Sequence, residues 1–242
     1  GQEDAQIVQL GYMALNNKKY DDAQKAFEYL MGKGKENPFY TQSFALKIHS
    51  SYLKFTDELA GSREEGEKIV AQFKEGLEFL GINGTTLNLV QENAHLLAFY
   101  LDKTDEAISM LNRGLETPNL KPEESGRLKT EMADIYIYAD DPWEATLIYS
   151  QVIDANKTNS LGDDVKLKKA QLGYYLGNFS WAKAQLDVLK ASTSKLTAKL
   201  IHWIAAGWKN CMGYLPISST DKRMLVNGEN FQKNNSREFL MQ

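Results

Sequence analysis

The sequence predicts an all-α protein in which helical hairpins stack into a solenoid of about five units. Three observations support this fold class. One short pattern recurs along the chain at a fairly even spacing, and all five prolines fall between or after the expected helices. No pair of segments with alternating apolar and polar residues indicates a β-hairpin.

The recurring pattern marks the expected start of the second helix of each hairpin. A bulky or loop-ending residue is followed three places later by Ala, and a large apolar residue follows four places after that. The Ala lets the first helix cross closely, and the large residue fills the space one helical turn further on. The four copies are Tyr20–Phe27, Thr104–Leu111, Pro142–Tyr149 and Phe179–Leu186.

The distances between the key alanines indicate a fifth copy. The last three alanines are 38 and 37 residues apart, whereas Ala23 lies 84 residues before Ala107. The segment Arg63–Val70 fills this gap, with Gly66 in place of Ala and steps of 43 and 41 residues. A period of about 34 residues is typical of tetratricopeptide repeats and about 40–47 of HEAT or armadillo repeats. The spacing alone does not choose between them.

Three segments carry residues that distinguish between these kinds of repeat. They are Leu10-Gly11-Tyr12 followed by Lys19–Phe27, Ala133–Tyr136 followed by Pro142–Ala145, and the continuous segment Ala170–Ala182. On these residues the chain resembles the tetratricopeptide-repeat superfamily over about residues 4–198, in five units of which those around Gly66 and Ala107 are degenerate. The resemblance implies a right-handed superhelix whose first helices line a concave face.

Two longer segments, Asp141–Val152 and Trp181–Leu196, are similar to a branch of exported bacterial tetratricopeptide proteins of the cell envelope. This resemblance implies a non-enzymatic protein that is exported, periplasmic or associated with the envelope. A chain that opens Gly1-Gln2-Glu3-Asp4 fits a protein whose leader has been removed. The alternative is a cytoplasmic protein whose chain is truncated ahead of Gly1.

From Lys199 onward the sequence departs from these relatives, which divides the chain into a repeat array, 1–198, and a divergent end, 199–242. The helical spacing of Leu200, Trp203 and Ile204 predicts a helix over 199–212 that caps the last hairpin. Residues 215–242 have no periodicity, which predicts a loosely attached polar tail or the product of a truncated or frame-shifted gene.

The charge and the hydropathy pattern exclude two classes of partner. The chain carries 28 basic and 32 acidic residues, a net charge of −4, so it lacks the positive surface that nucleic acid requires. The divergent end carries +3 and the repeat array −7. No run of about 18 apolar residues is present that could span a membrane.

Patterns typical of catalytic, metal and cofactor sites are absent from the sequence. The three histidines, His49, His95 and His202, lack the HxxxH or HExxH spacing of a metal site, and His95 is expected to be an ordinary helix-face residue. The single Cys211 can form neither a cysteine zinc site nor an internal disulfide. We expect no catalytic residue, no metal and no cofactor. Paired carboxylates fall instead at expected helix starts, where they cap free N–H groups: Asp21-Asp22, Glu64-Glu65, Asp140-Asp141 and Asp163-Asp164.

Tyrosines late in the expected first helices are the candidate binding residues. If these helices line the concave face, as the resemblance implies, Tyr12, Tyr138 and Tyr175 face a partner, with Asp134 as a polar neighbour. Tyrosine suits an interface because it is large and has a polar tip. The alternative is that most of these aromatic residues pack between repeats.

Two function classes follow. The first is a non-enzymatic scaffold that binds a protein or peptide segment on the concave face. The alternative is a cell-envelope accessory protein for ligand or nutrient capture, which a cluster of solvent-facing tryptophans would favour. Trp143 and Trp181 are expected to pack at the starts of second helices, and Trp203 and Trp208 lie in the divergent end.

Overall fold

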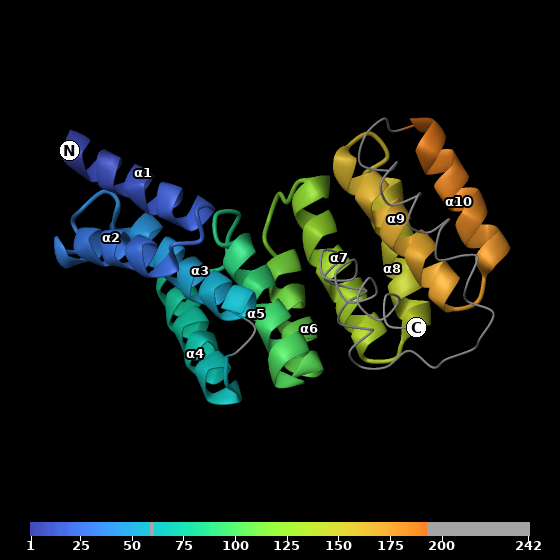
Figure 1. Ribbon diagram of the computed structural model, residues 1–242, viewed down its shortest axis with the longest axis horizontal. Helices are drawn as coiled ribbons and strands as arrows, with labels where there is room; N and C mark the ends of the chain where they lie inside the picture. Colours follow the sequence, from blue (N-terminus) through green and yellow to red (C-terminus); the bar gives the residue numbers. More distant parts are fainter. Residues whose placement is uncertain (59–60, 193–242) are drawn as a thin grey trace, which may run out of the picture. The chain divides into compact units, whose positions relative to one another are not determined.

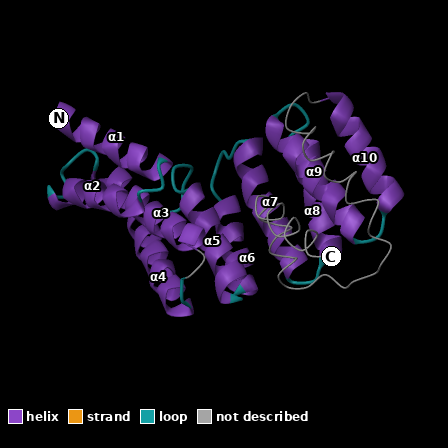
Figure 2. Cartoon of the chain, viewed as in Figure 1, coloured by secondary structure: helices purple, strands orange, loops and turns teal. Residues whose placement is uncertain are grey.

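The computed structural model describes residues 1–58 and 61–192, and these residues form ten α-helices and no strand (Figure 1, Figure 2). The chain divides into two compact units, Gly1–Leu120 and a second that begins at Lys121. The predicted all-α fold is confirmed. The expected capping helix over 199–212 and the tail over 215–242 lie outside the described residues.

Each unit is built from helical hairpins that pack in chain order. The first unit contains α1 (Gln2–Asn16), α2 (Tyr20–Gly32), α3 (Tyr40–Glu58), α4 (Arg63–Leu80), α5 (Leu87–Leu101) and α6 (Thr104–Leu115). The second unit contains α7 (Pro122–Tyr138), α8 (Pro142–Ala155), α9 (Ser160–Tyr175) and α10 (Phe179–Ser192). Among the described helices, none is long and apolar enough to cross a lipid bilayer.

The second helix of every hairpin begins at the residue that the sequence pattern predicts. These helices are α2, α4, α6, α8 and α10, so the degenerate copy at Arg63 is a genuine repeat. The four key alanines are completely buried, and Gly66 is buried as well. The large residue four places later is buried in four hairpins, whereas Val70 in α4 stays partly exposed. Burying such a side chain contributes about 2 kcal/mol, which explains why the pattern recurs.

In four of the hairpin turns, the residue two positions before the second helix has a left-handed backbone conformation. The residues are Lys18, Asp102, Asp140 and Gly177, with φ between 57° and 81°. In all four of these turns the next backbone N–H donates to a carbonyl of the first helix at 2.8 Å. This bond satisfies a carbonyl that the helix end leaves free. The predicted tight turn at Gly177-Asn178 is confirmed.

Capping accounts for the acidic residues at the starts of α4 and α8. The capping role predicted for Asp21-Asp22 and Asp163-Asp164 is wrong, because no side chain caps α2 and Asn159 caps α9. At α4, Ser62 and Glu65 form a reciprocal capping box, in which Ser62 Oγ accepts from Glu65 N at 3.2 Å and Glu65 Oε2 accepts from Ser62 N at 2.8 Å. At α8, Asp141 Oδ1 accepts from Glu144 N at 3.1 Å. These contacts agree with the structural role that the sequence predicts for Glu64-Glu65 and Asp140-Asp141.

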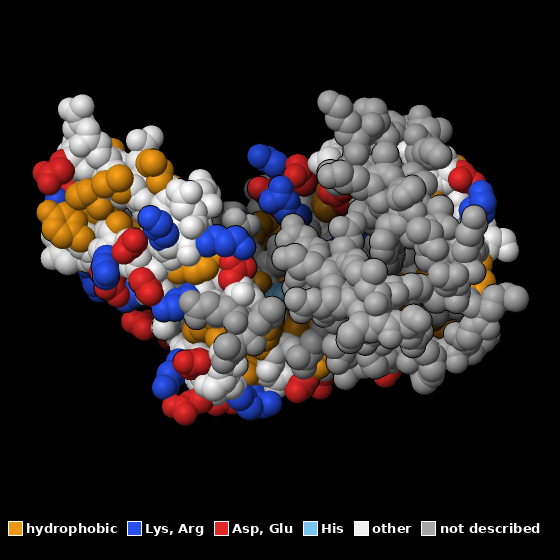
Figure 3. Space-filling model, viewed as in Figure 1, with side chains coloured by type: hydrophobic (Ala, Val, Ile, Leu, Met, Phe, Trp, Pro, Cys, Tyr) orange, Lys and Arg blue, Asp and Glu red, His pale blue; other side chains and the backbone are white. Residues whose placement is uncertain are grey.

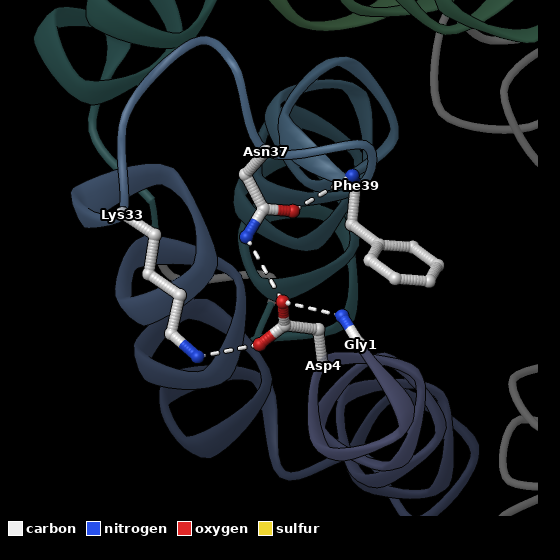
Figure 4. Close-up of polar contacts among 5 residues, drawn as sticks. All are labelled: Gly1, Asp4, Lys33, Asn37 and Phe39. Atoms are coloured by element: carbon white, nitrogen blue, oxygen red, sulfur yellow. Dashed lines mark hydrogen bonds and ion pairs between the residues drawn. The ribbon is translucent and has the colours of Figure 1, made fainter.

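Asp4 joins the first hairpin to the loop that follows it (Figure 4). Its carboxylate is largely buried and accepts hydrogen bonds from Lys33 Nζ, from Asn37 Nδ2 at 3.1 Å and from the Gly1 amine at 3.3 Å. The hydrogen bond from Lys33 is the main reason that the pKa of Asp4 lies below its ordinary value. Asn37 also accepts from Phe39 N, so one network fixes α1, the end of α2 and the approach to α3.

A glycine near the start of α9 allows its backbone to lie directly against the backbone at the end of α8. Asn156 ends α8, is buried, and donates from Nδ2 to Val152 O at 3.0 Å and Pro122 O at 3.2 Å. A Cβ at Gly162 would lie 2.1 Å from the backbone oxygen of Asn156. Because that neighbour is backbone and cannot swing away, only glycine fits at this position.

Gly162→Ala is therefore expected to destabilise the second unit by about 3 kcal/mol, because α9 must shift away from α8. Urea denaturation followed by circular dichroism measures this loss. Gly32→Ala is the control, since a Cβ at Gly32 meets no atom within 4 Å, and it should be neutral or slightly stabilising. Equal unfolding midpoints for the two variants would contradict the close approach at Gly162.

Candidate functional site

The predicted tyrosines lie in or at the ends of first helices, as the sequence suggests. Tyr12 is exposed on α1, and its hydroxyl accepts a hydrogen bond from Gln42 Nε2 of α3 at 3.2 Å. Tyr138 and Tyr175 are the last residues of α7 and α9 and are half-buried. Tyr12 therefore belongs to the first unit and the other two belong to the second.

Asp134 does not lie on an accessible face. It is only 4% exposed, and its carboxylate accepts hydrogen bonds from the Tyr149 hydroxyl and from Lys168 Nζ, the latter at 2.6 Å. Burial raises the pKa of Asp134 above its ordinary value, although the charge of Lys168 opposes that shift. Burial likewise raises the pKa of Tyr149. Because its partners come from α8 and α9, Asp134 fastens three helices together, and this geometry does not support a role in direct partner binding.

In the first unit, an imidazole and a carboxylate link the first helices of adjacent hairpins. His49 Nδ1 on α3 lies 2.6 Å from Glu92 Oε1 on α5. Burial disfavours the charged imidazole, but the hydrogen bond and the charge of Glu92 outweigh this effect, so the pKa of His49 is raised. Burial raises the pKa of Glu92, and His49 opposes this shift only in part. The pair thus forms a polar link whose charge depends on pH.

Aromatic rings continue from this pair along the same two helices. The rings of Tyr52 and His95 are 6.1 Å apart, those of His95 and Tyr100 are 6.0 Å apart, and Tyr100 lies 5.3 Å from Phe55. His49 and Tyr52 are three residues apart on α3, as are Glu92 and His95 on α5, so each pair shares a helix face. We call the following set the first-helix row: Tyr12, His49, Tyr52, Glu92, His95 and Tyr100.

The first-helix row offers ring faces, a hydroxyl, an imidazole and a carboxylate on α3 and α5, which pack on each other, and on α1, which Tyr12 links to α3 through Gln42. Such a mixture can hold an extended peptide by stacking and by hydrogen bonds. Sequence reasoning missed most of this row. The spacing of His49 and Tyr52, repeated by Glu92 and His95, was the available signal. It becomes meaningful only when α3 and α5 are placed side by side.

The prediction that Trp143 packs in the hairpin is wrong, because its side chain is 85% exposed. It is the second residue of α8, and the buried face of that helix is formed by Ala145, Ile148, Tyr149 and Val152. Trp181 packs in part, since a Cβ at Gly173 would lie 2.7 Å from its ring, but its side chain is 40% exposed. In the described part of the chain, no group of three His, Cys, Asp or Glu side chains could hold a metal ion.

Comparison with known protein families finds no family model that matches the chain, and no curated protein matches it either. Among solved structures, the chain is similar to Pseudomonas aeruginosa pilF, from a structure described as its functional characterization. The TM-score is 0.60 at 14% sequence identity, and the match covers 99% of this chain and 97% of that one. At this identity the likeness concerns the fold. It confirms that the chain has a tetratricopeptide-like helical fold.

Proposed function

We propose that this protein is a non-enzymatic scaffold that binds a segment of a partner protein on the face formed by its first helices. The observation that carries the proposal is the first-helix row, in which aromatic and hydrogen-bonding side chains of α1, α3 and α5 lie on neighbouring helices. The tetratricopeptide-like fold favours the same conclusion, because stacked hairpins build extended binding surfaces.

The chemistry of the row indicates what kind of segment would bind. Rings of Tyr52, His95 and Tyr100 suit apolar or aromatic side chains, and tyrosine hydroxyls can pair with peptide groups. The His49–Glu92 pair adds a site for a polar side chain between α3 and α5. In the second unit, Tyr138 and Tyr175 at the ends of α7 and α9 would form a set of contacts of their own.

We further propose that the protein works at the bacterial cell envelope, on the resemblance of Asp141–Val152 and Trp181–Leu196 to exported relatives. The alternative function there is ligand or nutrient capture by an accessory protein. The exposed Trp143 favours that alternative, because an exposed indole can stack on a flat ligand. The scaffold remains our main proposal, since its supporting residues come from three adjacent helices and this one comes from a single position.

Affinity capture with quantitative mass spectrometry tests the scaffold, using the parent chain and two double variants as bait. Tyr12→Ala/His49→Ala removes an exposed and a half-buried group from the first unit, and Tyr138→Ala/Tyr175→Ala removes two half-buried groups from the second. We expect at least one of them to lose about tenfold or more of the specifically captured partner, as is usual for interface tyrosines.

The matched control is Tyr29→Ala, which removes an exposed tyrosine from the second helix α2. It should capture the partner as well as the parent does. All bait proteins must give the helical circular dichroism spectrum of the parent. If both double variants retain the partner, or if only Tyr29→Ala loses it, the binding surface is not formed by the first helices.

A further inference from the structure

A histidine–carboxylate pair of the first unit joins the first helices of two consecutive hairpins. His49 Nδ1 of α3 lies 2.6 Å from Glu92 Oε1 of α5. The imidazole side chain is 32% exposed and the carboxylate side chain 15%, so protons from solvent reach the ring while the carboxylate is mostly covered. Helices α3 and α5 pack on each other although α4 separates them in the sequence. The pair therefore spans a boundary between repeats.

The carboxylate of Glu92 depends on His49 for its hydrogen bonding. Glu92 Oε2 is buried and accepts no hydrogen bond from a described residue. A buried carboxylate is costly unless donors and positive charge compensate it. A protonated imidazole provides both, through a charge-assisted hydrogen bond, whereas a neutral imidazole provides only an ordinary hydrogen bond. The strength of the contact between α3 and α5 consequently depends on the protonation of His49.

The charges that act on this pair come from its own two helices. His95 of α5 also acts on Glu92, and its charge opposes the rise in pKa that burial causes. Lys47, two residues before the histidine of the pair on α3, pairs instead with Glu28 of α2 at 2.8 Å. Among the described charged groups of α2, α4 and α6, which pack on α3 or α5, none contributes to the pKa shift of either member. The pair can therefore be treated as a local two-group system beside His95.

We propose that the His49–Glu92 pair is a pH-sensitive link, which holds α3 against α5 more tightly while His49 is protonated than after His49 loses its proton. Tyr52 lies one helical turn after His49 and His95 one turn after Glu92, and the rings of Tyr52 and His95 are 6.1 Å apart. A weaker contact between α3 and α5 therefore also weakens the aromatic part of the first-helix row. Its effect on partner binding rests on the function proposed above, whereas the link itself can be measured without a partner.

Loss of the proton from His49 weakens the folded state. Burial lowers the pKa of His49, but the hydrogen bond and the charge of Glu92 raise it further, so the folded pKa lies above the ordinary value of 6.5. Such a group binds more protons when folded, so its contribution to stability is fully present below the unfolded pKa and is lost as the pH rises through the folded pKa. The pKa of Glu92 is also raised, which acts in the same direction at lower pH. The contact between α3 and α5 should therefore weaken from about pH 6 to about pH 8.

NMR titration and amide hydrogen exchange of the full chain test the proposal. The Cε1 proton of His49, assigned as the signal that His49→Gln removes, should titrate with a midpoint above about 6.5 in the parent. Glu92→Gln keeps the shape and an acceptor oxygen but removes the charge, so burial should bring this midpoint below about 6.5. Hydrogen exchange is compared at about pH 6 and about pH 8 after correction for the intrinsic rates. Protection of α3 and α5 should fall at least about twofold in the parent and should not fall in Glu92→Gln.

Glu28→Gln is the matched control, because it removes a carboxylate that also contacts α3, through Lys47, but that has no histidine partner there. Protection of α3 and α5 in this variant should fall between the two pH values as it does in the parent. A parent midpoint below about 6.5, an unchanged midpoint in Glu92→Gln, or protection in the parent that does not depend on pH would each overturn the proposal. An equal fall in Glu92→Gln would overturn it too, since the loss would then come from other groups. Failure of the affinity capture described above would contradict the scaffold but not the link, because these measurements contain no partner.

Discussion

Replacing Ala182 with Asp is expected to unfold the α9–α10 hairpin. Ala182 is completely buried, and its Cβ lies 3.8 Å from where a Cβ of Gly173 would stand, so α9 and α10 cross closely there. A carboxylate at this point would lose its hydration. We expect a loss of at least about 4 kcal/mol, combining the buried charge with overpacking.

The control for this variant is Ala184→Asp, which introduces the same side chain on the exposed side of the same helix. Its cost should be about 0.7 kcal/mol, the difference in helix propensity between Ala and Asp. Because one hairpin can unfold without the rest of a repeat array, hydrogen exchange of α9 and α10 should be measured together with the melting temperature. Similar protection of these helices in both variants would mean that α10 does not pack through Ala182.

Lys168→Met is expected to destabilise the second unit by about 3 kcal/mol. Lys168 provides the cation that faces the buried carboxylate of Asp134, and breaking such a pair leaves a charge in the interior. Tyr149 still donates its hydrogen bond but carries no compensating charge. Urea denaturation at neutral pH measures the loss.

The adjacent Lys169→Met is the control. Lys169 bonds to Ser150 Oγ at 2.8 Å and lies 5.5 Å from the centre of the Trp181 ring, so its removal should cost at most about 1 kcal/mol. If both lysine variants lose the same stability, Asp134 does not depend on Lys168 for its charge.

The pH dependence of Lys168→Met provides a second readout. Burial already raises the pKa of Asp134, and loss of the Lys168 charge raises it further. A carboxyl whose folded pKa lies above its unfolded pKa binds more protons when folded, so its contribution to stability is lost as the pH rises through the folded pKa. The deficit of Lys168→Met relative to the parent should therefore be largest at neutral pH and shrink towards about pH 4, near the unfolded pKa of Asp.

The repeat architecture could be predicted because its signals are local. The start of each second helix follows from a few adjacent residues, such as Pro142 and Ala145 in α8 or Ser62 and Glu65 at α4. A small residue at a helix crossing and a large one four places later constrain the hairpin whatever the rest of the chain does. The degenerate copy at Gly66 was found in the same way, since a glycine also permits the close crossing.

The candidate site was predicted only in part. Tyr12, Tyr138 and Tyr175 were correctly assigned to first helices, because that follows from their place in the repeat. The pairing of His49 with Glu92 joins residues of two different hairpins. Their sequence positions do not reveal that relation, since it depends on how α3 packs on α5.

The helices, their order and the small residues at which they cross follow from short stretches of sequence. Which side of each helix is covered depends on how the helices pack on one another. Asp134 looked like a polar surface residue but is buried by partners from α8 and α9, and Trp143 looked like a packing residue but points to solvent. Both outcomes depend on the rotation of one helix against its neighbours. A difference of one residue in the sequence rotates a side chain by about 100°, enough to move it from the core to the surface.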